Sequence, residues 1–491
     1  MNDLEMLKAI DAVIAQGPYR SDWESLSGNI VPAWFRDAKF GLFVHWGVFS
    51  VPAFANEWYP RNMYIKDDPA YAHHRKTYGA HKHFGYKDFI PLFTMERFEP
   101  SEWAELFKES GARYVVPVAE HHDGFQLYRS ALSHYNAAEM GPRRDLLGDL
   151  KRAVEEAGII FGASSHRAEH WFFLGHGRDF DSDIQEPLNR GDLYWPSVSP
   201  EPSHQDLRGE PCPSPEYLTD WLFRTVELID RYRPRLLYFD WWVQHAAFKE
   251  NLKKALAYYR NRAAQWKAEV TVCTKFDAAA FGASIVEIER GKFAQAKPFV
   301  WQTETPVAKN SWSYTKQNQY KKSSDIVREL ADVVSKNGNL LLNIGPTSCG
   351  IIPPEDERII RDIGGWLKVN GEAIFGSTVW KVQAEGPTQE SEGQFQDNES
   401  PLYTEEDFRF TARGGAIYAI ALQYPKSGTV RIRSFSHFQD PKRLGFHGLI
   451  KDLSILGSKE KPEWSVTDKA LIVSTKSVSS DFPIVIKITV E

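Results

Sequence analysis

Residues able to carry out acid–base or nucleophilic chemistry stand directly after short apolar runs in this chain. The run 40–44 ends on His45, and Glu57 follows soon after it. The run 236–239 ends on Asp240. A carboxylate at such a position can act as a nucleophile when a second carboxyl lies nearby to supply and remove a proton. Imidazole and carboxylate groups also hydrogen-bond hydroxyl-rich ligands. These residue types therefore predict a ligand site at the ends of apolar strands.

A histidine beside a packing tryptophan is also a common arrangement in protein cores, so one such run alone does not indicate a ligand site. The same arrangement, an apolar run followed by polar residues, recurs along the first 345 residues. The apolar runs are 114–119, 159–163, 236–239, 270–274, 298–301 and 339–342. Helix-like segments separate them, at 103–110, 146–157, 217–232, 251–267 and 324–335. Short apolar strands that alternate with helices indicate a parallel sheet. Seven or eight such units predict a closed (β/α) barrel, in which the carboxyl ends of the strands meet at one face.

The pattern changes beyond Gly376, where short alternating segments replace the helical ones. These segments are 407–411, 416–422, 429–432, 471–473 and 484–490, and they are typical of an antiparallel β-sandwich. The polar stretch 385–400 is expected to be an exposed loop. We therefore predict an α/β protein with a (β/α)8-like barrel over residues 1–380, including a short N-terminal helix, and a C-terminal antiparallel β-sandwich over residues 381–491.

The composition limits which partners and which cellular compartment we expect for this protein. A formal net charge of -6 makes nucleic acid an unfavourable partner. Cys212, Cys273 and Cys349 have no metal-binding spacing, and we expect free thiols in a reducing compartment. The N-terminal segment with Asp3 and Glu5 lacks the apolar core of a secretory signal, and no run of about 18 apolar residues would span a membrane. We expect a cytoplasmic protein without a membrane partner; self-association into a homo-oligomer stays open.

Six motifs, in order over roughly residues 30–380, resemble the α-L-fucosidases of glycoside hydrolase family 29. They lie at residues 34–47, 56–59, 120–125, 238–240, 311–314 and 339–346. The resemblance implies a barrel-like catalytic domain followed by a β-sandwich. It also implies hydrolysis of α-L-fucosides with retention, through a covalent fucosyl-enzyme intermediate, and a fucosylated oligosaccharide or glycoside as the substrate. The family's nucleophile, an aspartate after the fourth barrel strand, matches Asp240.

Asp240 also has physical support from its surroundings in the sequence. It ends an apolar strand and precedes Trp241 and Trp242, so we expect it in a partly dry aromatic pocket. Burial alone would raise the pKa of its carboxyl, so hydrogen-bond donors must hold it ionised. The alternative is an aspartate that only caps the following helix.

The acid/base residue is sought in residues 285–291, where family members carry a glutamate on a variable loop. Glu287 and Glu289 have the same parity on an extended segment, so both side chains can point the same way. Glu289 is favoured because it borders a predicted turn into a loop. Many relatives carry a Thr-Pro-Glu motif that this chain lacks, and Glu304 is a third candidate. A solvated charge or a salt bridge with Arg290 is the alternative for the two glutamates of this segment.

The resemblance also implies the residues that bind the sugar. Those matching His45, Glu57, His121 and His122 hydrogen-bond the fucose hydroxyls, and Trp58 lines the pocket near the apolar face of the sugar. We assign the rest of the pocket to His166, Tyr238, Lys275 and Trp312. Lys275 stands where many relatives present an arginine towards the nucleophile.

A metal site at residues 121–123 is the competing interpretation. Adjacent residues at a strand end point to opposite sides, and no histidine pair has helical metal-binding spacing, so we expect no metal and no cofactor. Two other functions stay open. One is a hydrolase of a related sugar such as an α-L-galactoside. The other is a carbohydrate-binding protein that has lost catalysis, against which the presence of Asp240 argues.

Overall fold

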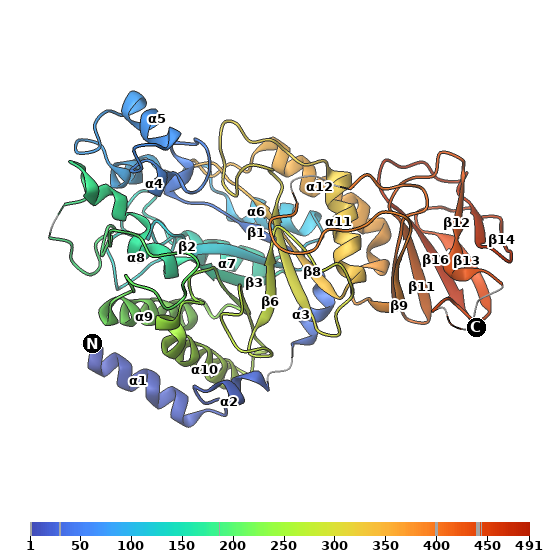
Figure 1. Ribbon diagram of the computed structural model, residues 1–491, viewed down its shortest axis with the longest axis horizontal. Coiled ribbons are helices and arrows are strands. Elements are labelled where there is room, and N and C mark those ends of the chain that lie inside the picture. The colour runs from blue at the N-terminus through green and yellow to red at the C-terminus, as the bar shows by residue number, and fades with distance from the viewer. Residues whose placement is uncertain (1, 29–30, 186, 398–400, 438–441, 443) are drawn as a thin grey trace.

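The computed structural model describes residues 2–28, 31–185, 187–397, 401–437, 442 and 444–491. Eight parallel strands follow one another around a closed barrel, and β8 pairs with β1 to complete it (Figure 1). Their bounds are β1 (Phe40–Val44), β2 (Tyr114–Glu120), β3 (Ile160–Ser165), β4 (Leu236–Phe239), β5 (Thr271–Thr274), β6 (Ile285–Glu289), β7 (Trp301–Pro306) and β8 (Gly338–Ile344). The predicted barrel is confirmed.

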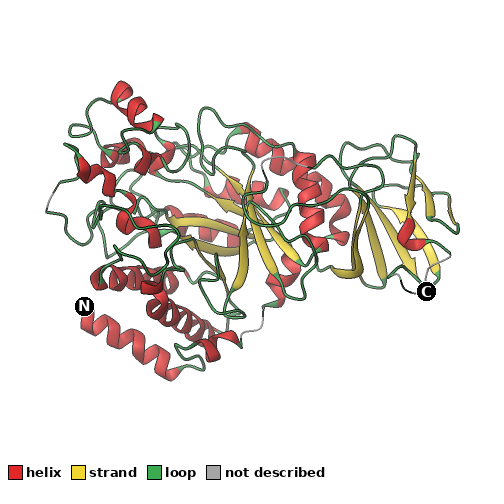
Figure 2. Cartoon of the chain, viewed as in Figure 1, coloured by secondary structure: helices red, strands yellow, loops and turns green. Residues whose placement is uncertain are grey.

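The strands form where the sequence is apolar on both faces. Every residue of β1, β2 and β8 is buried, which is the burial pattern of a parallel sheet covered on one side by helices and filled on the other by side chains. The helices that follow the strands pack outside them (Figure 2). The main ones are α6 (Pro100–Glu109), α7 (Leu146–Glu156), α9 (Pro215–Tyr232), α10 (Lys249–Trp266), α11 (Ser323–Ser335) and α12 (Pro354–Asn370).

Local capping sets where several helices begin. The Asp145 carboxylate accepts a hydrogen bond from Gly148 N at 3.1 Å at the start of α7, and Ser214 Oγ accepts one from Tyr217 N at the start of α9. A capping box of Asn2 and Glu5 starts the N-terminal helix. The remaining α-helices are α1 (Asp3–Gln16), α2 (Trp23–Ser27), α3 (Ala33–Ala38), α4 (Tyr59–Asn62), α5 (Pro69–Thr77) and α8 (His170–Phe173).

The barrel departs from regular alternation on one side. In the fully described stretches 275–284 and 290–300, no α-helix follows β5 or β6. The outer face of β6 and β7 is covered instead by a small apolar cluster, in which Phe293 and Phe299 pack against Ile288, Trp301 and Val333. Short connections leave no length for a crossover helix, because a helical crossover needs a dozen or more residues. This part of the barrel is therefore open to other segments of the chain.

The C-terminal part is an antiparallel sandwich of two sheets, as predicted (Figure 1). One sheet has the order β13-β16-β11-β10-β9 and the other the order β12-β15-β14. The bounds are β9 (Thr378–Glu385), β10 (Phe408–Arg413), β11 (Ala416–Ala421), β12 (Thr429–Ile432), β13 (Ile450–Ile455), β14 (Trp464–Val466), β15 (Leu471–Ser474) and β16 (Ile484–Val490). The sequence analysis did not identify β9, β13 or β14. Their burial is partial, so their apolar alternation is weak.

Residues 386–397 form a loop in which no residue is buried, as predicted for 385–400, of which 398–400 lie outside the described residues; the loop also contacts the barrel. Lys292 and Gly393 exchange two backbone hydrogen bonds, at 3.1 and 3.0 Å. Asp397 forms ion pairs with Arg290 at 2.8 Å and Lys321 at 2.6 Å. The prediction of an exposed loop is confirmed for 386–397, but its contacts with the barrel were not predicted, because the partner residues lie far earlier in the chain, where no local pattern reveals them.

Two further expectations concern the cysteines and membranes. Cys212, Cys273 and Cys349 are all free thiols. Among the described residues, no helix combines the length and apolar character that crossing a bilayer requires.

Candidate active site

A cavity of about 390 Å³ lies at the carboxyl ends of the barrel strands. It brings together most of the residues predicted from the sequence. Its lining is Phe43, His45, Asn56, Glu57, Trp58, Asn62, His121, His122, His166, Asp240, Trp241, Lys275, Glu289, Arg290, Glu304, Asn310, Ser311, Trp312 and Phe395.

Asp240 is the first residue after β4, and Asp240 N donates to Ser165 O at the end of β3. This backbone hydrogen bond continues the parallel ladder one residue beyond the strand and fixes the direction of the side chain. His166 Nδ1 lies 3.0 Å from Asp240 Oδ2, and His122 Nε2 lies 3.2 Å from the same oxygen. Lys275 Nζ lies 2.7 Å from Asp240 Oδ1. Both carboxylate oxygens are therefore held by groups that favour the ionised form.

The electrostatics of Asp240 follow from these partners. Burial alone would raise the pKa of the carboxyl, but Lys275, His166 and His122 together hold it well below its usual range. The carboxylate is therefore ionised at neutral pH, although the residue is only 5% exposed. An ionised, oriented carboxylate is the form that a nucleophile requires.

Lys275 is the charged centre of the site. Its Nζ lies 2.7 Å from carboxylate oxygens of Asp240, Glu289 and Glu304. Burial would lower the pKa of the ammonium, but the three carboxyl groups raise it well above its ordinary value. One lysine thus offsets part of the charge of three acidic residues and reduces their mutual repulsion.

The three glutamates considered as acid/base occupy different places. Glu289, the last residue of β6, lines the cavity. Glu304 on β7 pairs with it in register and also lines the cavity. Burial raises the pKa of Glu304 to about 7, with Glu289 and Asp240 adding to the effect.

Glu287 is not among the residues that line this cavity; its Oε2 accepts from Gln302 Nε2 at 2.7 Å. Burial and the neighbouring Glu304 raise the pKa of Glu287 well above its ordinary value. The shared parity of Glu287 and Glu289 therefore does not bring both carboxyls to the cavity.

The two histidines beside Asp240 differ in charge. Burial lowers the pKa of His166 to about 4, so its ring is neutral at pH 7. His122 is also buried, but the carboxylates of Glu169 at 3.1 Å and Asp240 raise its pKa to about 9. His122 is therefore a cation at neutral pH and His166 is a neutral donor to Asp240.

His45 stands directly after β1, and its ring orientation is set by Asn343 near the end of β8. Asn343 Nδ2 donates to Trp312 O at 2.6 Å, which turns the amide oxygen towards His45 Nδ1 at 2.7 Å. Nδ1 must therefore carry a hydrogen, and Nε2 is left as an acceptor. Burial lowers the pKa of His45 well below its ordinary value, so the ring is neutral.

Glu57 belongs to the segment before α4, and its side chain lines the cavity. Its Oε2 accepts hydrogen bonds from Trp312 N at 2.9 Å and from Ser311 Oγ at 3.1 Å. These donors fix the carboxyl against the loop that follows β7. Burial raises the pKa of Glu57 above its ordinary value despite them.

Aromatic side chains form much of the remaining wall. Trp58 lies 5.8 Å from His122 and 6.2 Å from Trp241, measured between ring centroids. Trp312 lies 5.3 Å from His45. Tyr238 was predicted to bind substrate, but it does not line the cavity. It lies beneath the floor, 5.1 Å from Phe43 and with Lys275 Nζ 5.8 Å from its ring centroid. Its position follows from its place inside β4, one residue before the strand ends.

Trp46 and Trp242 belong to the core, although Trp242 was expected in the aromatic pocket around Asp240. Trp46 donates to Val118 O at 2.8 Å and packs against Phe98 and Trp103, so it points away from the cavity. Trp242 packs against Phe172 instead of joining Trp241 in the wall. The reason is the same for both: in each pair of adjacent residues, only one side chain faces the cavity.

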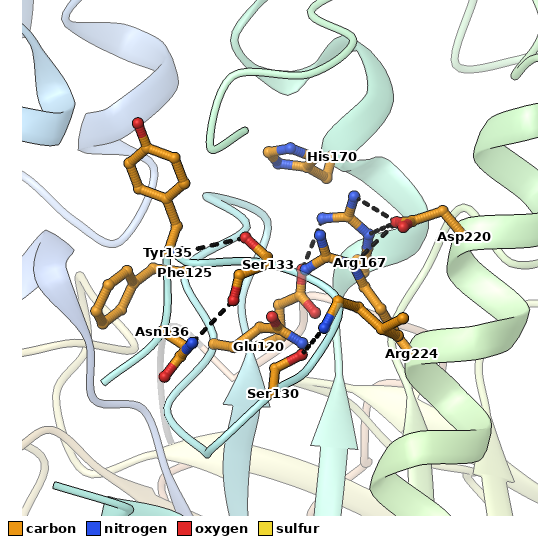
Figure 3. Close-up of polar contacts among 12 residues, drawn as sticks. Glu120, Phe125, Ser130, Ser133, Tyr135, Asn136, Arg167, His170, Asp220 and Arg224 are labelled. Atoms are coloured by element: carbon orange, nitrogen blue, oxygen red, sulfur yellow. Dashed lines mark hydrogen bonds and ion pairs between the residues drawn. The ribbon is translucent and has the colours of Figure 1, made fainter. Parts of the chain in front are cut away.

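A buried ion cluster supports the strand ends behind the histidines (Figure 3). Glu120 precedes His121, and Arg167 follows His166. Arg167 Nη1 lies 2.7 Å from Glu120 Oε1, and its Nη2 lies 2.8 Å from Asp220 Oδ2. Arg224 bridges the same two carboxylates, at 3.1 and 2.9 Å.

The prediction that adjacent side chains at residues 121–123 point to opposite sides was partly wrong. Both His121 and His122 line the cavity, because β2 ends at Glu120 and the chain turns after it. Asp123 instead accepts a hydrogen bond from Tyr86 OH at 2.5 Å, away from the lining.

Several donor groups in the cavity lie close enough to hold a cation. Three sets have donor atoms within 4.8 Å of one another: His45, His121 and His166; His122, His166 and Asp240; Asp240, Glu289 and Glu304. In the last set the Lys275 ammonium already lies among the oxygens. Two of these sets include Asp240, the candidate nucleophile. The expectation of no metal stays a prediction.

Three residues that the site uses were not singled out from the sequence, namely Glu169, Asn343 and Phe395, whereas Trp241 was expected in the aromatic pocket around Asp240. Glu169 pairs with His122, Asn343 orients His45, and Trp241 and Phe395 line the wall. Asn343 ends an apolar run and Trp241 follows Asp240, so both carried a signal in the sequence. Glu169 and Phe395 carried none, because their contacts depend on the tertiary fold.

A closed barrel with paired carboxylates and a set of hydrogen-bonding side chains at its mouth defines a class of barrel enzyme that includes many glycosidases. A family model described as Alpha-L-fucosidase matches residues 6–372. The chain is 31% identical over 488 residues to the tissue α-L-fucosidase of Homo sapiens, a match that covers 97% of this chain and 93% of that protein. The chain belongs to the α-L-fucosidase family.

Solved structures agree with this assignment. The crystal structure of Thermotoga maritima α-fucosidase in complex with a mechanism-based inhibitor matches with a TM-score of 0.73 and 29% identity, covering 96% of this chain and 100% of that one. An α-L-fucosidase isoenzyme from Paenibacillus thiaminolyticus is 22% identical with a TM-score of 0.66, which shows the shared fold.

Proposed function

We propose that this protein is a retaining exo-α-L-fucosidase, with Asp240 as nucleophile and Glu289 as acid/base. The observation that carries the proposal is the spacing of the carboxylates. Oxygens of Asp240, Glu289 and Glu304 lie within 4.8 Å of one another around one cavity. Retaining glycosidases hold their two carboxyl groups about 5 to 5.5 Å apart, whereas inverting enzymes need about 6.5 to 9.5 Å to admit a water.

The reaction then has two displacements. Asp240 attacks the anomeric carbon while protonated Glu289 gives its proton to the departing glycosidic oxygen, which leaves a β-linked fucosyl-enzyme and the alcohol. Glu289, now a carboxylate, takes a proton from water, and that water displaces Asp240 to release α-L-fucose. Two inversions give net retention. Glu304 also lines the cavity and contacts Lys275 at the same 2.7 Å as Glu289, but it lies within β7, whereas Glu289 is the last residue of β6 and is therefore the better placed donor to a leaving group.

Sugar recognition is divided between polar and aromatic groups. His45, Glu57, His121, His122 and His166 offer hydrogen-bonding groups to the ring hydroxyls. The rings of Phe43, Trp58, Trp241 and Trp312 offer carbon surface to the C5 methyl group and the apolar face of the sugar. An α-L-galactoside carries a C6 hydroxyl in place of a methyl hydrogen. Crowding and desolvation of that hydroxyl should cost roughly 1 to 3 kcal/mol in transition-state binding.

Hydrolysis of nitrophenyl α-L-fucoside, with the released sugar followed by NMR before it mutarotates, tests the proposal. We expect α-L-fucose as the first product, and a kcat/KM for the fucoside that exceeds the one for nitrophenyl α-L-galactoside. A β anomer as the first product would contradict retention. Equal kcat/KM values for both substrates would favour the broader L-sugar hydrolase, and binding without turnover would favour an inactive carbohydrate-binding protein.

We also propose a cytoplasmic location and a reaction that needs no metal. Free Cys212, Cys273 and Cys349 support a reducing compartment. The Lys275 ammonium among the carboxylates supports catalysis without an added cation. Cell fractionation tests the first statement. Activity that survives dialysis against a chelator supports the second, and restoration by an added divalent cation after such dialysis would contradict it.

A further inference from the structure

A segment from the C-terminal part of the chain reaches the mouth of the cavity. Residues 386–397 follow β9, the first strand of the sandwich, and Phe395 is among the residues that line the cavity. Its side chain is large and apolar, yet the residue is 52% exposed. Single exposed apolar residues are common on protein surfaces, so exposure alone carries no function. The place of this ring relative to the catalytic carboxylates is the informative feature.

Backbone pairing joins this segment to the end of β6. Phe395 N donates to Glu289 O at 2.9 Å, and Gln396 N donates to Arg290 O at 2.6 Å. Phe395 is thus in direct backbone contact with the residue proposed as acid/base. The barrel has no helix after β6 in the fully described stretch 290–300, and this gap lets the segment approach the active-site end.

An ion-pair anchor holds the segment from its other side. The Asp397 side chain is only 5% exposed and contacts Arg290 Nε at 2.8 Å and Lys321 Nζ at 2.6 Å. Thr305 Oγ1 donates to the same carboxylate at 2.6 Å. Phe395 itself has a φ of 56°, in the left-handed region that side chains other than glycine adopt at a cost. The anchor and the backbone pairing together maintain that conformation and keep the ring at the rim.

We infer that Phe395 is the platform of a leaving-group subsite, on which the sugar next to fucose places the apolar face of its ring. The inference rests on the proposed function, because it uses the role of Glu289. A general acid must lie beside the glycosidic oxygen that it protonates, so the leaving group emerges on the Glu289 side of the cavity. Phe395 stands on that side. An exposed aromatic ring gives a pyranose carbon surface at little cost in conformational entropy. The substrate class is therefore a fucosylated oligosaccharide, rather than a fucoside with a small leaving group.

The test compares two substrates that differ only in the leaving group. α-L-Fucosyl fluoride has no second sugar, whereas a fucosyl disaccharide places one on the platform. A panel of disaccharides of different linkage identifies the one that the wild-type enzyme cleaves fastest. The measured quantity is the ratio of kcat/KM for that disaccharide to kcat/KM for the fluoride. In Phe395→Ala we expect this ratio to fall by about tenfold, the effect of one lost aromatic contact.

Two further variants complete the experiment. Phe395→Tyr keeps an aromatic ring and should keep the ratio within about twofold of wild type. Phe281→Ala removes another exposed phenylalanine, 71% exposed and outside this cavity, and should leave the ratio unchanged. An unchanged ratio in Phe395→Ala, or an equal fall in Phe281→Ala, would overturn the inference. Release of fluoride by the wild-type enzyme tests the hydrolase itself, so failure of the proposed function is seen separately.

Discussion

At the scale of single residues, Lys275 sets the charge state of the Asp240 carboxyl. Its ammonium lies 2.7 Å from the Asp240 carboxylate and is the main group that offsets the effect of burial on the pKa of Asp240. Removal of the charge in Lys275→Met should raise the pKa of Asp240. The acidic limb of the kcat/KM profile should therefore move to higher pH, by about one pH unit or more. A pH series with nitrophenyl α-L-fucoside measures this.

The matched control is Lys336→Met, which removes another buried lysine. Lys336 is 1% exposed at the side chain and pairs with Asp332, and it does not line the cavity. Its loss should lower stability but leave the acidic limb in place. An acidic limb that does not move in Lys275→Met would show that the lysine does not set the charge of the nucleophile.

The sequence already indicated most of the residues that line the cavity, because strand ends in a parallel barrel meet at one face. Asp240 and Lys275 each follow an apolar run directly, and His166 follows one after two serines. Glu169 could not be predicted from the sequence, because its pairing with His122 depends on how α8 folds back. Which of Glu287 and Glu289 faces the cavity also required the structure, because parity alone gave both the same direction.

At the scale of elements, the ion cluster behind β2 and β3 holds the segments that carry His121 and His166 (Figure 3). Arg167→Met leaves the buried carboxylates of Glu120 and Asp220 with fewer partners. The free energy of unfolding should fall by about 3 to 5 kcal/mol, the usual cost of breaking a buried ion pair. Activity should fall as well, because the strand ends are no longer fixed. Urea denaturation and kcat/KM measure the two effects.

An exposed arginine provides the comparison. Arg152 on α7 is 71% exposed at the side chain and pairs with Asp149. Arg152→Met should change neither activity nor the free energy of unfolding by more than measurement error, as expected for a surface ion pair. If Arg167→Met were equally mild, the cluster would not be what fixes the strand ends.

The elements themselves were predictable to different degrees. The barrel strands followed from apolar runs and the long helices from their periodicity, since both are local patterns. The missing helices after β5 and β6 were not foreseen, and neither was the return of residues 386–397 to the barrel. Both depend on contacts between distant parts of the chain.

At the scale of the whole molecule, a second buried ion cluster joins the sandwich to the barrel. Asp332 on α11 pairs with Arg409 on β10, with Lys336 at 2.7 Å and with Lys292 at 3.2 Å. Burial would raise the pKa of Asp332, but the three cations hold it far below its ordinary value. The domains are therefore coupled by a carboxylate that is ionised in the folded protein at all ordinary pH values.

Asp332→Asn should lower the free energy of unfolding at pH 7 by about 3 to 5 kcal/mol. The pKa of Asp332 is lower in the folded state than in the unfolded state, so its contribution is complete above the unfolded pKa near 4 and is lost as the pH falls below it. The difference between wild type and Asp332→Asn should therefore shrink between pH 5 and pH 3. Urea denaturation at several pH values measures it.

Asp325→Asn is the control on the same helix. Asp325 pairs with Arg328 and is 24% exposed at the side chain, so its loss should cost less than about 1 kcal/mol. A wild-type advantage over Asp332→Asn that grew as the pH fell would contradict the assigned direction of the pKa of Asp332.

Azide rescue tests the proposed roles of Asp240 and Glu289 at once. Glu289→Ala still forms the fucosyl-enzyme from an activated fucoside but lacks the base that activates water. Azide needs no base, so it should restore turnover and give α-fucosyl azide, after two inversions. Asp240→Ala should give the β-azide by one direct inversion. NMR against both standards identifies the anomer.

Glu287→Ala is the matched control, since Glu287 lies two residues away and does not line the cavity. We expect α-fucosyl azide from Glu289→Ala and no azide dependence in Glu287→Ala. A β-azide from Glu289→Ala, or no rescue of that variant, would contradict the role of Glu289 as acid/base. An α-azide from Glu287→Ala alone would move the acid/base role to Glu287.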